Sequence, residues 1–405
     1  MSDGPLVVVG IGADGWFGLG EGARTALLGA QEIVGSARQL ELLPAAVNAV
    51  RRAWPSPIDP LLDELTDNAG STTCVLASGD PMLHGIGATL ARRVAPERLL
   101  VHQHPSAFAL ACARLGWPAA DVELISAVAR PLESIMRSLQ PGRRLIVYVT
   151  GADGAAGVAG VLCEHGFGAS PLIVLEQLGG PRERIVQSTA HEWGGQPADV
   201  LHAVAIECRP DPGTTPLARA PGLPDDAYES DGQLTKRHMR AITLAALGPL
   251  PGQLLWDVGA GSGSIAIEWL RAEPGARAIA VEARPDRAAR ASRNARRLGV
   301  PELDVRVGQA PDALDGLPQP DAVFVGGGLA EARVLEHCWE PLRPGGRMVA
   351  NAVTLEGEQA LLAARSAHGG QLSRIEIAHA EPLGSLTSWR SQRPVVQWSA
   401  SKEQA

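Results

Sequence analysis

Short apolar runs recur along the chain, and each one is closed by glycine, proline or polar residues. Runs of this kind, rich in Val, Ile, Leu and Ala, are typical of buried strands. The stretches at 107–115, 154–162 and 265–271 lie between such runs and are helix candidates. Strands that alternate with helices predict an α/β fold. The predicted strands are residues 6–9, 32–35, 74–77, 99–101, 144–149, 172–175, 254–258, 278–282, 303–307 and 321–325, with 374–379 and 395–398 as a closing antiparallel pair.

A run rich in proline and glycine divides the chain. Residues 209–224 hold five prolines and two glycines, and proline interrupts both helices and inner strands. A chain of 405 residues also exceeds the usual size of one domain. We therefore predict a first domain over 1–208, a linker over 209–224 and a second domain over 225–405.

Composition and charge narrow the class of protein. A net charge of −8 argues against a protein that binds nucleic acid through phosphate contacts. The five cysteines are scattered without a C-x-x-C pair, and the histidines lack a metal-binding spacing, so neither a disulfide framework nor a metal site is expected. No signal-type segment and no long apolar run is present. We expect a cytoplasmic homo-oligomer with neither a membrane nor a nucleic-acid partner.

The most informative stretch combines an apolar strand, a glycine-rich turn and the start of a helix, from Leu254 to Ile265. Gly259, Gly261 and Gly263 have no Cβ, so the backbone can turn tightly and approach a ligand closely. The helix start behind the turn offers unpaired N–H groups. The spacing is G-x-G-x-G rather than the G-x-G-x-x-G of dinucleotide sites, and Asp257 precedes it. An acid there disfavours a pyrophosphate and suits a cationic ligand such as S-adenosylmethionine.

A second acid supports this interpretation. Glu282 ends the next apolar strand, about 20 residues beyond the turn, where doubly wound folds place a carboxylate on a ribose. The alternative is an ordinary strand-to-helix turn followed by a surface glutamate.

The first strand runs into a formal G-x-G-x-x-G at residues 10–15. The second strand, however, ends at Gly35-Ser36 without an acid to hold a ribose. A tight turn, or a loop that faces a substrate other than a dinucleotide, is therefore the preferred interpretation.

Three motifs in the first half resemble the tetrapyrrole (corrin and porphyrin) methylases over about residues 5–205: Val9-Gly10-Ile11-Gly12, Ser78-Gly79-Asp80-Pro81 and His104-Pro105-Ser106-Ala107-Phe108. The resemblance, closest to the members that methylate precorrins at C-5, implies a two-lobed class III methyltransferase fold. It implies that Gly79, Asp80, Pro81, Ser106 and Ala107 line S-adenosylmethionine and that Gly10 and Gly12 face the substrate cleft. The alternative for the Gly-Asp-Pro motif alone is a plain turn with proline in a favoured position.

The second half resembles the class I, Rossmann-like methyltransferases, and in detail the precorrin C-15 methyltransferases that also decarboxylate. The motifs that carry the resemblance are Leu234-Thr235-Lys236, the glycine turn, Phe324-Val325-Gly326-Gly327-Gly328 and Asn351-Ala352-Val353-Thr354. Leu329 departs from the small residue often found after the triple glycine. An alternative role for Thr235 is to cap the following helix. The cofactor positions predicted here are Thr235, Asp257, Gly259, Ala260, Gly261, Ser262, Gly263, Glu282 and Ala310, and the resemblance places Gly326, Gly327 and Gly328 at the substrate cleft.

Both modules in this order resemble a fused family of cobalamin biosynthesis. The resemblance implies an enzyme that binds S-adenosylmethionine at two sites, methylates the tetrapyrrole precorrin-6B at C-5 and C-15, and removes a ring C acetate carboxyl to give precorrin-8X. No acid–base residue is assigned from the sequence. Two alternatives stay open: an RNA or protein methyltransferase with a tetrapyrrole-like binding module, and a first half that only presents substrate.

A row of arginines at helical spacing follows the second acid. The residues are Arg284, Arg287, Arg290, Arg293, Arg296 and Arg297. A solvated helix face is the preferred interpretation, and a guide for the carboxylates of the substrate is the alternative.

Overall fold

The chain folds into two units. The computed structural model describes residues 5–67, 72–329, 331 and 333–403. Unit 1 comprises Met1–Leu132 and Leu139–Thr215, and unit 2 comprises Glu133–Ser138 and Pro216–Ala405. The division falls inside the predicted linker 209–224. In the part of the chain that the structure describes, no helix has the length and apolarity needed to cross a membrane.

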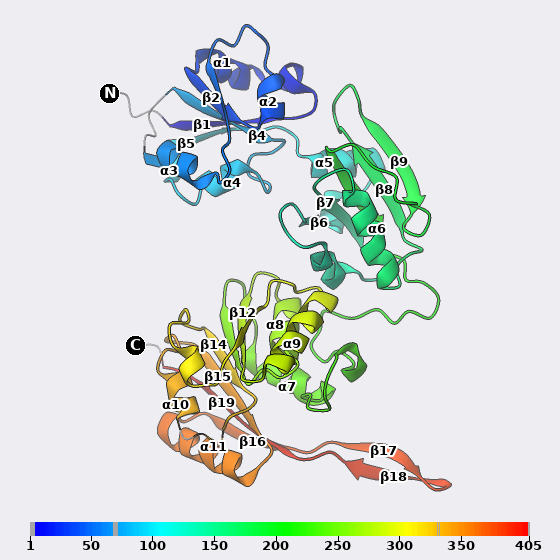
Figure 1. Cartoon of the computed structure of the whole chain (residues 1–405), viewed down its shortest axis with the longest axis vertical. Helices are drawn as coiled ribbons and strands as arrows, with labels where there is room; N and C mark the ends of the chain where they lie inside the picture. The colour runs from blue at the N-terminus through cyan, green and yellow to red at the C-terminus, as the bar shows by residue number, and fades with distance from the viewer. Residues whose placement is uncertain (1–4, 68–71, 330, 332, 404–405) are drawn as a thin grey trace. The chain divides into compact units, whose positions relative to one another are not determined.

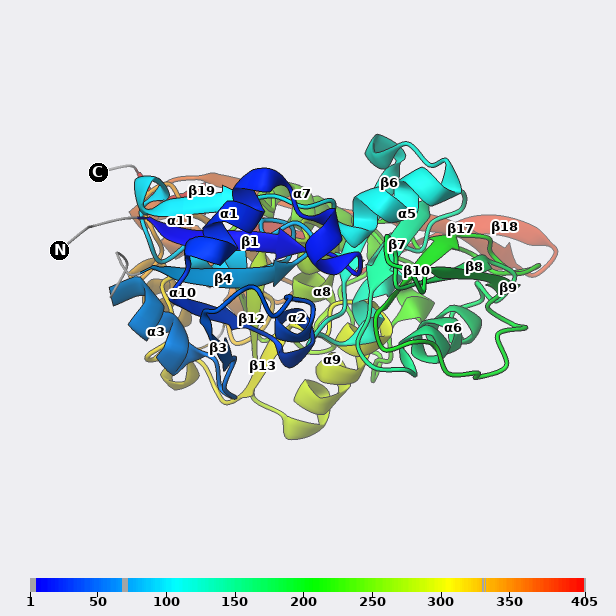
Figure 2. The ribbon, with the colours of Figure 1, turned by 90° about the horizontal axis from the view of Figure 1, so that it is seen from above.

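Unit 1 begins with a parallel five-stranded sheet in the order β3-β2-β4-β1-β5. β1 and β4 run side by side at its centre (Figure 2). Val8 packs in one core cluster with Leu61, and Val9 packs in the opposite cluster with Leu27. Both faces of β1 are therefore buried, which explains its continuous apolar run. The elements are β1 (Leu6–Ile11), α1 (Glu21–Gly29), β2 (Glu32–Gly35), α2 (Ala37–Glu41), β3 (Val50–Ala53), α3 (Asp59–Asp67), β4 (Thr73–Ser78), α4 (Ile86–Leu90) and β5 (Leu99–His102).

A second five-stranded sheet completes unit 1 (Figure 1), and its strand order is β6-β7-β10-β8-β9 (Figure 2). β6 and β7 are parallel, and the other pairs are antiparallel. Unit 1 therefore has the two α/β lobes that were predicted. The elements are α5 (Ala107–Leu115), β6 (Val122–Ser126), β7 (Arg144–Tyr148), α6 (Gly154–Glu164), β8 (Pro171–Glu176), β9 (Arg184–Thr189) and β10 (His202–Glu207).

Unit 2 is built on a seven-stranded sheet in the order β13-β12-β11-β14-β15-β19-β16. The first five of these strands are parallel, and β19 is antiparallel to both neighbours. The strand order reverses between β11 and β14, the place where open α/β sheets bind ligands. The elements are α7 (Arg237–Leu247), β11 (Leu254–Val258), α8 (Ser264–Ala272), β12 (Arg277–Glu282), α9 (Pro285–Arg297), β13 (Asp304–Val307), β14 (Ala322–Val325), α10 (Val334–Trp339), β15 (Arg347–Ala352), α11 (Leu355–His368), β16 (Gln371–Ile375) and β19 (Val395–Ser401).

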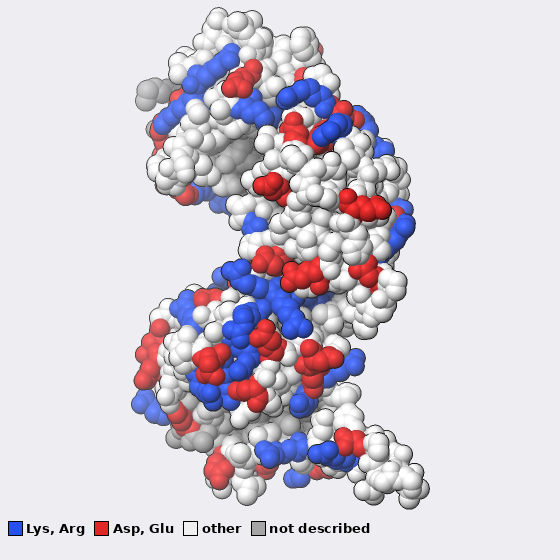
Figure 3. All heavy atoms as spheres, turned by 45° about the vertical axis from the view of Figure 1, so that its right-hand side comes forward, with Lys and Arg blue, Asp and Glu red and all other residues white. Residues whose placement is uncertain are grey.

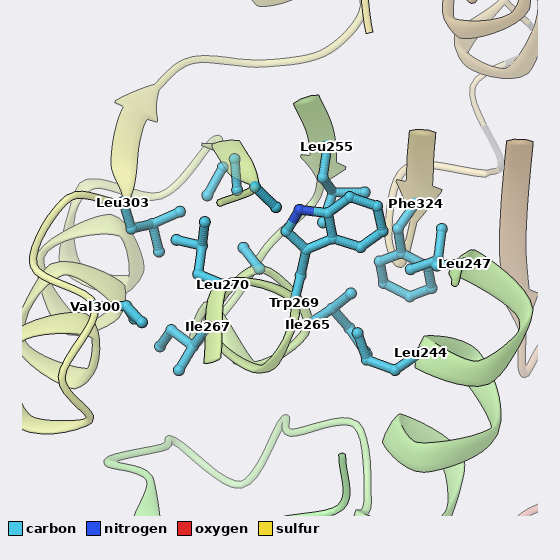
Figure 4. Packing of buried hydrophobic residues seen from close by; sticks show 14 of the residues in the cluster. Leu244, Leu247, Leu255, Ile265, Ile267, Trp269, Leu270, Val300, Leu303 and Phe324 are labelled. Atoms are coloured by element: carbon cyan, nitrogen blue, oxygen red, sulfur yellow. The ribbon is translucent and has the colours of Figure 1, made fainter. Parts of the chain in front are cut away.

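Aliphatic side chains and one tryptophan fix α8 on this sheet. Trp269 is fully buried and points toward Leu255 of β11 and Phe324 of β14 (Figure 4). Leu244 and Leu247 of α7 close the same cluster. Because α8 begins directly behind the glycine turn, this packing also fixes the turn at the end of β11.

The end of the chain differs from the prediction. The closing antiparallel pair exists, but it joins β16 to β19, with Arg374 opposite Val396. The predicted strand 374–379 is wrong in extent, because His379 belongs to a separate hairpin of β17 (Ala378–Leu383) and β18 (Leu386–Ser391). The exposed side chains of this hairpin include Leu383, Leu386 and Trp389. The sequence of the hairpin therefore lacks the alternation of buried apolar and exposed polar positions that predicts a strand.

The predicted linker is held by contacts at both of its ends, with unit 1 at its start and with unit 2 at its end. The Asp211 carboxylate accepts hydrogen bonds from Gly168 N at 3.1 Å and Ala169 N at 2.7 Å in unit 1. Leu223 is buried in the core of unit 2. Proline and glycine therefore mark a change of direction here, and contacts on each side hold the chain in place.

A buried ion pair anchors the entry into unit 2. Arg240 on α7 and Glu268 on α8 are essentially unexposed, and Arg240 Nε donates to Glu268 Oε1 at 2.8 Å. The same carboxylate accepts from Gly222 N at 2.6 Å and from Tyr228 Oη at 2.9 Å. Arg240 Nη1 also donates to the carbonyl oxygen of Thr235. One pair therefore holds two helices and the segment that precedes α7.

We predict that Glu268→Gln lowers the free energy of unfolding of unit 2 by about 3 kcal/mol, because it leaves the buried Arg240 guanidinium with the half-exposed Asp225 as its remaining charged partner. Urea unfolding followed by circular dichroism measures this. The matched control is Glu381→Gln, which removes the partner of Arg390 in an exposed hairpin pair and should cost less than about 1 kcal/mol. Equal effects of the two substitutions would contradict the anchoring role.

Candidate cofactor and substrate sites

Unit 2 holds a cavity of about 1270 Å3 at the carboxyl ends of its parallel strands. The glycine turn after β11, Glu282 at the end of β12 and the triple glycine after β14 all line it. Small-molecule pockets usually measure about 300–1,000 Å3. This cavity therefore has room for a nucleotide-sized molecule together with part of a larger one.

Two glycine segments meet in this cavity. Gly259 has a φ of +73°, and a Cβ at this position would lie 2.8 Å from Gly327 N. Gly261 also adopts a left-handed conformation, with a φ of +59°. No side chain fits between the two segments, so the backbone itself forms the cavity wall. A ligand there meets peptide groups of the turn.

Glu282 lies beside the turn, and its carboxylate can accept more hydrogen bonds than it does here. Its Oε2 accepts a hydrogen bond from Gly261 N at 2.8 Å, and its Oε1 accepts one from Arg284 N at 3.0 Å. Each carboxylate oxygen has a further lone pair. The side chain lines the cavity, so it can accept hydrogen bonds from two hydroxyl groups of a ligand while it holds the turn.

Asp257 lies beneath the turn rather than in the cavity wall. Leu255 and Asp257 share one face of β11 because side chains alternate along a strand, and that face points to α8. Asp257 Oδ2 accepts from Ala266 N at 3.0 Å, and Oδ1 has no hydrogen-bond partner in the described residues. Burial, with a smaller contribution from the Glu282 charge, raises the pKa of Asp257 to about 7. The prediction that Asp257 contacts the ligand directly is therefore not supported, because its carboxyl does not line the cavity.

The remaining predicted positions of unit 2 fall into two groups. Gly263 has a left-handed φ of +77° but faces Ala291 of α9, so it serves helix packing and does not line the cavity. The proposal that Thr235 caps a helix is wrong, because Lys236 occupies the N-cap of α7 and makes no side-chain cap bond. The cavity is lined by Thr235, Ala260, Ser262, Ala310, Gly326, Gly327 and Gly328.

The cavity also includes residues that the sequence analysis missed. His379, Arg390 and Arg393 line it from the base of the β17–β18 hairpin. Asn351 lines it from β15, the strand that carries one of the resemblance motifs. The hairpin has no sequence signal, so these side chains could not be found in advance. Leu329, the departure from the family pattern, is buried in the core and leaves the cavity clear.

Three loops of unit 1 lie close together at positions where glycine residues have no side chain to keep them apart. A Cβ on Gly10 would lie 2.3 Å from Gly79 O and 3.0 Å from His104 N. Gly79 is left-handed with a φ of +59°, and its Cβ would lie 3.2 Å from Ser106 Cα and 3.7 Å from Ala107 N. The predicted residues at the ends of β1, β4 and β5 therefore come together.

Side chains around this junction hold the loops in shape. Ser106 caps α5 by accepting from Ala109 N at 3.1 Å. Asp80 Oδ1 accepts from Met82 N at 2.8 Å, and Pro81 packs against Gly85, where a Cβ would lie 2.6 Å from its carbonyl oxygen. These bonds turn the side chains of Ser106 and Asp80 toward their own loops, which leaves backbone groups to meet a ligand.

His104 is a further residue that the sequence analysis did not assign. It is buried, and its Nε2 lies 3.1 Å from the Asp14 carboxylate while its Nδ1 lies 3.1 Å from Pro105 O. Both ring nitrogens therefore lie beside hydrogen-bond acceptors. A Cβ on Gly12 would lie 2.5 Å from His104 Cε1, so a larger residue at this position would clash with the imidazole ring. Within the described residues, no three acidic, His or Cys side chains are grouped to hold a metal ion.

The arginine row of α9 is solvated in part: Arg284, Arg293, Arg296 and Arg297 are exposed, whereas Arg287 and Arg290 are half-buried. Arg287 and Arg290 pair with Asp231, and Arg293 pairs with Glu229. On the face drawn in Figure 3, cationic and anionic side chains are interspersed. Three of the six arginines are therefore engaged with acids of a segment about sixty residues earlier in the chain.

Comparison with known proteins places both halves. Residues 226–402 match the family described as precorrin methyltransferase domain, and residues 5–193 match the tetrapyrrole (corrin/porphyrin) methylases. The chain is 45% identical over 397 residues to a protein of a Sinorhizobium species, covering 98% of this chain and 96% of the relative. It is 46% identical over 401 residues to one of Mycobacterium tuberculosis strain CDC 1551, covering 98% and 100%. Both relatives are named precorrin-6Y C(5,15)-methyltransferase [decarboxylating].

A shorter relative carries a narrower name. A protein of Salmonella typhimurium, cobalt-precorrin-6B C(15)-methyltransferase (decarboxylating), is 30% identical over 176 residues. The match covers 42% of this chain and 90% of that protein. Its name joins methylation at one carbon with decarboxylation in a protein of about half this length.

The crowding at Gly10 predicts a stability effect. Gly10→Ala should lower the free energy of unfolding of unit 1 by about 1–3 kcal/mol, because the added methyl group overlaps backbone atoms. Gly160→Ala in α6 is the control, since nothing lies within 4 Å of its added methyl group, and helix propensity should raise stability there by up to about 1 kcal/mol. Thermal unfolding measures both. An unchanged Gly10→Ala protein would mean that the loops are farther apart in solution.

Proposed function

The chain belongs to the family of the precorrin-6Y C(5,15)-methyltransferases (decarboxylating), and from this premise we propose how its two units divide the work. Like its relatives, it is a methyltransferase of cobalamin biosynthesis that depends on S-adenosylmethionine and acts on a tetrapyrrole. We propose that unit 1 methylates precorrin-6B at C-5 and that unit 2 methylates C-15 and removes the ring C acetate carboxyl. An RNA or protein methyltransferase is not favoured by these relatives.

The observation that carries the division is the presence of two glycine-walled junctions on two different folds. One lies at Gly10 and Gly79, and the other lies at Gly259 and Gly327. Each junction is formed by loops of one unit, and each unit has its own strand order. We propose that each junction holds one S-adenosylmethionine, which makes two per chain.

The residues of unit 2 fit this cofactor. Glu282 has lone pairs for the two ribose hydroxyls, and the turn at Gly259–Ser262 offers backbone groups to the amino acid end. Thr235 and Ala310 line the same cavity. The cofactor supplies an electrophilic methyl group on a sulfonium. Asp257 lies beneath the turn, and a bound cation nearby would favour the ionised form of its carboxyl.

We propose that the other part of the cavity takes the tetrapyrrole. Gly326, Gly327 and Gly328 leave a wall without side chains, which suits a flat macrocycle. Arg393 lines the cavity, and no hydrogen-bond or ion-pair partner for it exists among the described residues. A tetrapyrrole of this class carries several carboxylates, and a guanidinium forms bidentate bonds with a carboxylate.

In unit 1 we propose that backbone groups of Gly79, Asp80, Pro81, Ser106 and Ala107 hold the cofactor and that Gly10 and Gly12 face the substrate. Alignment of donor and acceptor can supply several kcal/mol of the barrier. An electron-rich meso carbon of the substrate attacks the methyl group, and the sulfur–methyl bond breaks, with its electron pair left on sulfur, as the new carbon–carbon bond forms. Loss of carbon dioxide leaves its electron pair in the conjugated macrocycle. The homo-oligomer, the cytoplasmic location and the absence of nucleic-acid and membrane partners stay predictions.

Product analysis tests the division of the chemistry. Purified protein is given S-adenosylmethionine and precorrin-6B, and the products are analysed by mass spectrometry. Gly79→Val with Asp80→Ala should yield a product with one added methyl group and one lost carboxyl. Glu282→Ala should weaken the unit 2 cofactor site by about 10–100-fold, because a hydrogen bond to a charged group contributes roughly 1.5–3 kcal/mol. At limiting cofactor it should lose decarboxylation together with one methylation.

Calorimetry on the same variants is the control. Wild type should bind two cofactor molecules per chain, and each variant should lose affinity at one site only. If the Gly79/Asp80 variant still adds both methyl groups, or if Glu282→Ala leaves both sites undisturbed, this division of roles is wrong.

The raised pKa of Asp257 predicts a pH dependence of cofactor binding. With its pKa at about 7, this carboxyl is mostly protonated at pH 6, and a bound cation favours its ionised form. Binding at unit 2 should therefore release a proton below pH 7, and affinity should rise by up to about tenfold from pH 6 to pH 8. Calorimetry in two buffers of different ionisation enthalpy detects the proton. Asp257→Asn should remove the effect, and the unit 1 site serves as the internal reference.

A further inference from the structure

A segment without regular secondary structure crosses the cavity of unit 2. We call residues 229–236, which precede α7, the strap. Its part from Gly232 to Lys236 lines the cavity. A Cβ on Gly261 would lie 3.9 Å from Gln233 O, so the strap passes close to the glycine turn. A ligand between the turn and the strap can leave on this side only if the strap moves.

The first half of the strap has no apolar anchor. Tyr228, just before it, is buried, and Leu234 packs partly against the core, but residues 229–233 are Glu, Ser, Asp, Gly and Gln. None of these five residues is buried. Hydrophobic burial therefore does not hold this half in place, and polar contacts must do so.

Those contacts come from α9. Asp231 Oδ2 lies 2.8 Å from Arg287 Nε and 3.3 Å from Arg290 Nη1. Arg287 Nη2 also donates to Gln233 Oε1 at 2.9 Å. The Arg287 and Arg290 side chains are only 17% and 16% exposed, so this triad is better shielded from water than a usual surface pair. The Gln233 N–H bond and then the Arg287 bond lower the pKa of Asp231 to about 2.

A buried amide joins the strap to the glycine turn. Asn294 is 0% exposed, and its Oδ1 accepts from Glu229 N at 2.9 Å. Its Nδ2 donates to Glu229 O and to Ser262 O, both at 3.0 Å. Glu229 begins the strap and Ser262 belongs to the turn. One side chain of α9 therefore sets the spacing between the two walls of the cavity.

We propose that Asn294, Arg287 and Arg290 are positioning residues for the cofactor site of unit 2. The ion pairs of Asp231 with Arg287 and Arg290, which we call the latch, keep the strap over the bound cofactor. This inference rests on the proposed function of unit 2. The pairing of Arg287 and Arg290 with Asp231 thereby acts on the cofactor through the strap, while Arg284 and Arg287 also line the cavity.

Asp231→Asn tests the latch because it keeps the side-chain shape and removes the charge. It should weaken S-adenosylmethionine binding at unit 2 by about 5–10-fold, mainly through faster dissociation, and leave unit 1 unchanged. Asp286→Asn is the matched control: it also removes the partner of an α9 arginine, Arg284, but lies off the strap. Asp231→Glu should restore most of the affinity. Wild-type affinity should fall with added salt more steeply than that of Asp231→Asn, because salt screens the latch.

Hydrogen exchange of the strap amides gives a second readout that needs no ligand. Exchange at 229–236 should be faster in Asp231→Asn than in Asp286→Asn. Asn294→Asp, which turns an acceptor toward two carbonyl oxygens, should weaken unit 2 further, and its circular dichroism shows whether it folds. If strap exchange is the same in the two aspartate variants, or if it rises without any loss of affinity, the proposal is overturned. If wild-type unit 2 binds no S-adenosylmethionine, the proposed function fails as well.

Discussion

The buried pair of Arg240 and Glu268 is the interaction on which unit 2 depends. Removing two charges from water is costly, and the cost is offset here because the carboxylate receives bonds from the guanidinium, from backbone N–H groups and from Tyr228. The guanidinium also reaches Asp225 and the carbonyl of Thr235. Helices α7 and α8 and the segment between the units are therefore fixed to one another before any ligand is present.

From this anchor the geometry of the cavity follows. Helix α8 begins behind the glycine turn, so fixing α8 fixes the turn, and fixing Thr235 fixes the end of the strap. The opposite end of the strap is held by polar contacts to α9, chiefly those of Asp231 and Asn294. One end is thus bonded to a fully buried guanidinium, while the other depends in part on charges that lie nearer to water. Such a difference suits a wall that must stay in place and yet let a ligand in and out.

The two units reach a similar solution on different sheets. In unit 1 the close approach is between Gly10 and Gly79, and in unit 2 it is between Gly259 and Gly327. In both places a Cβ would overlap backbone atoms. Backbone groups therefore form these junctions, and the acidic side chains nearby, Asp80 and Glu282, brace the loops that carry them.

The sequence by itself determined the α/β class, the position of most inner strands and the glycine turns, because buried strands and tight turns leave local signals in composition. It also identified Glu282, whose position after a strand is a local pattern. Only the tertiary structure decided that Asp257 lies under the turn, that Arg287 pairs with Asp231 and that the hairpin brings Arg393 to the cavity. These facts depend on which face of a strand meets a helix and on partners that are distant in sequence, and no local pattern records either.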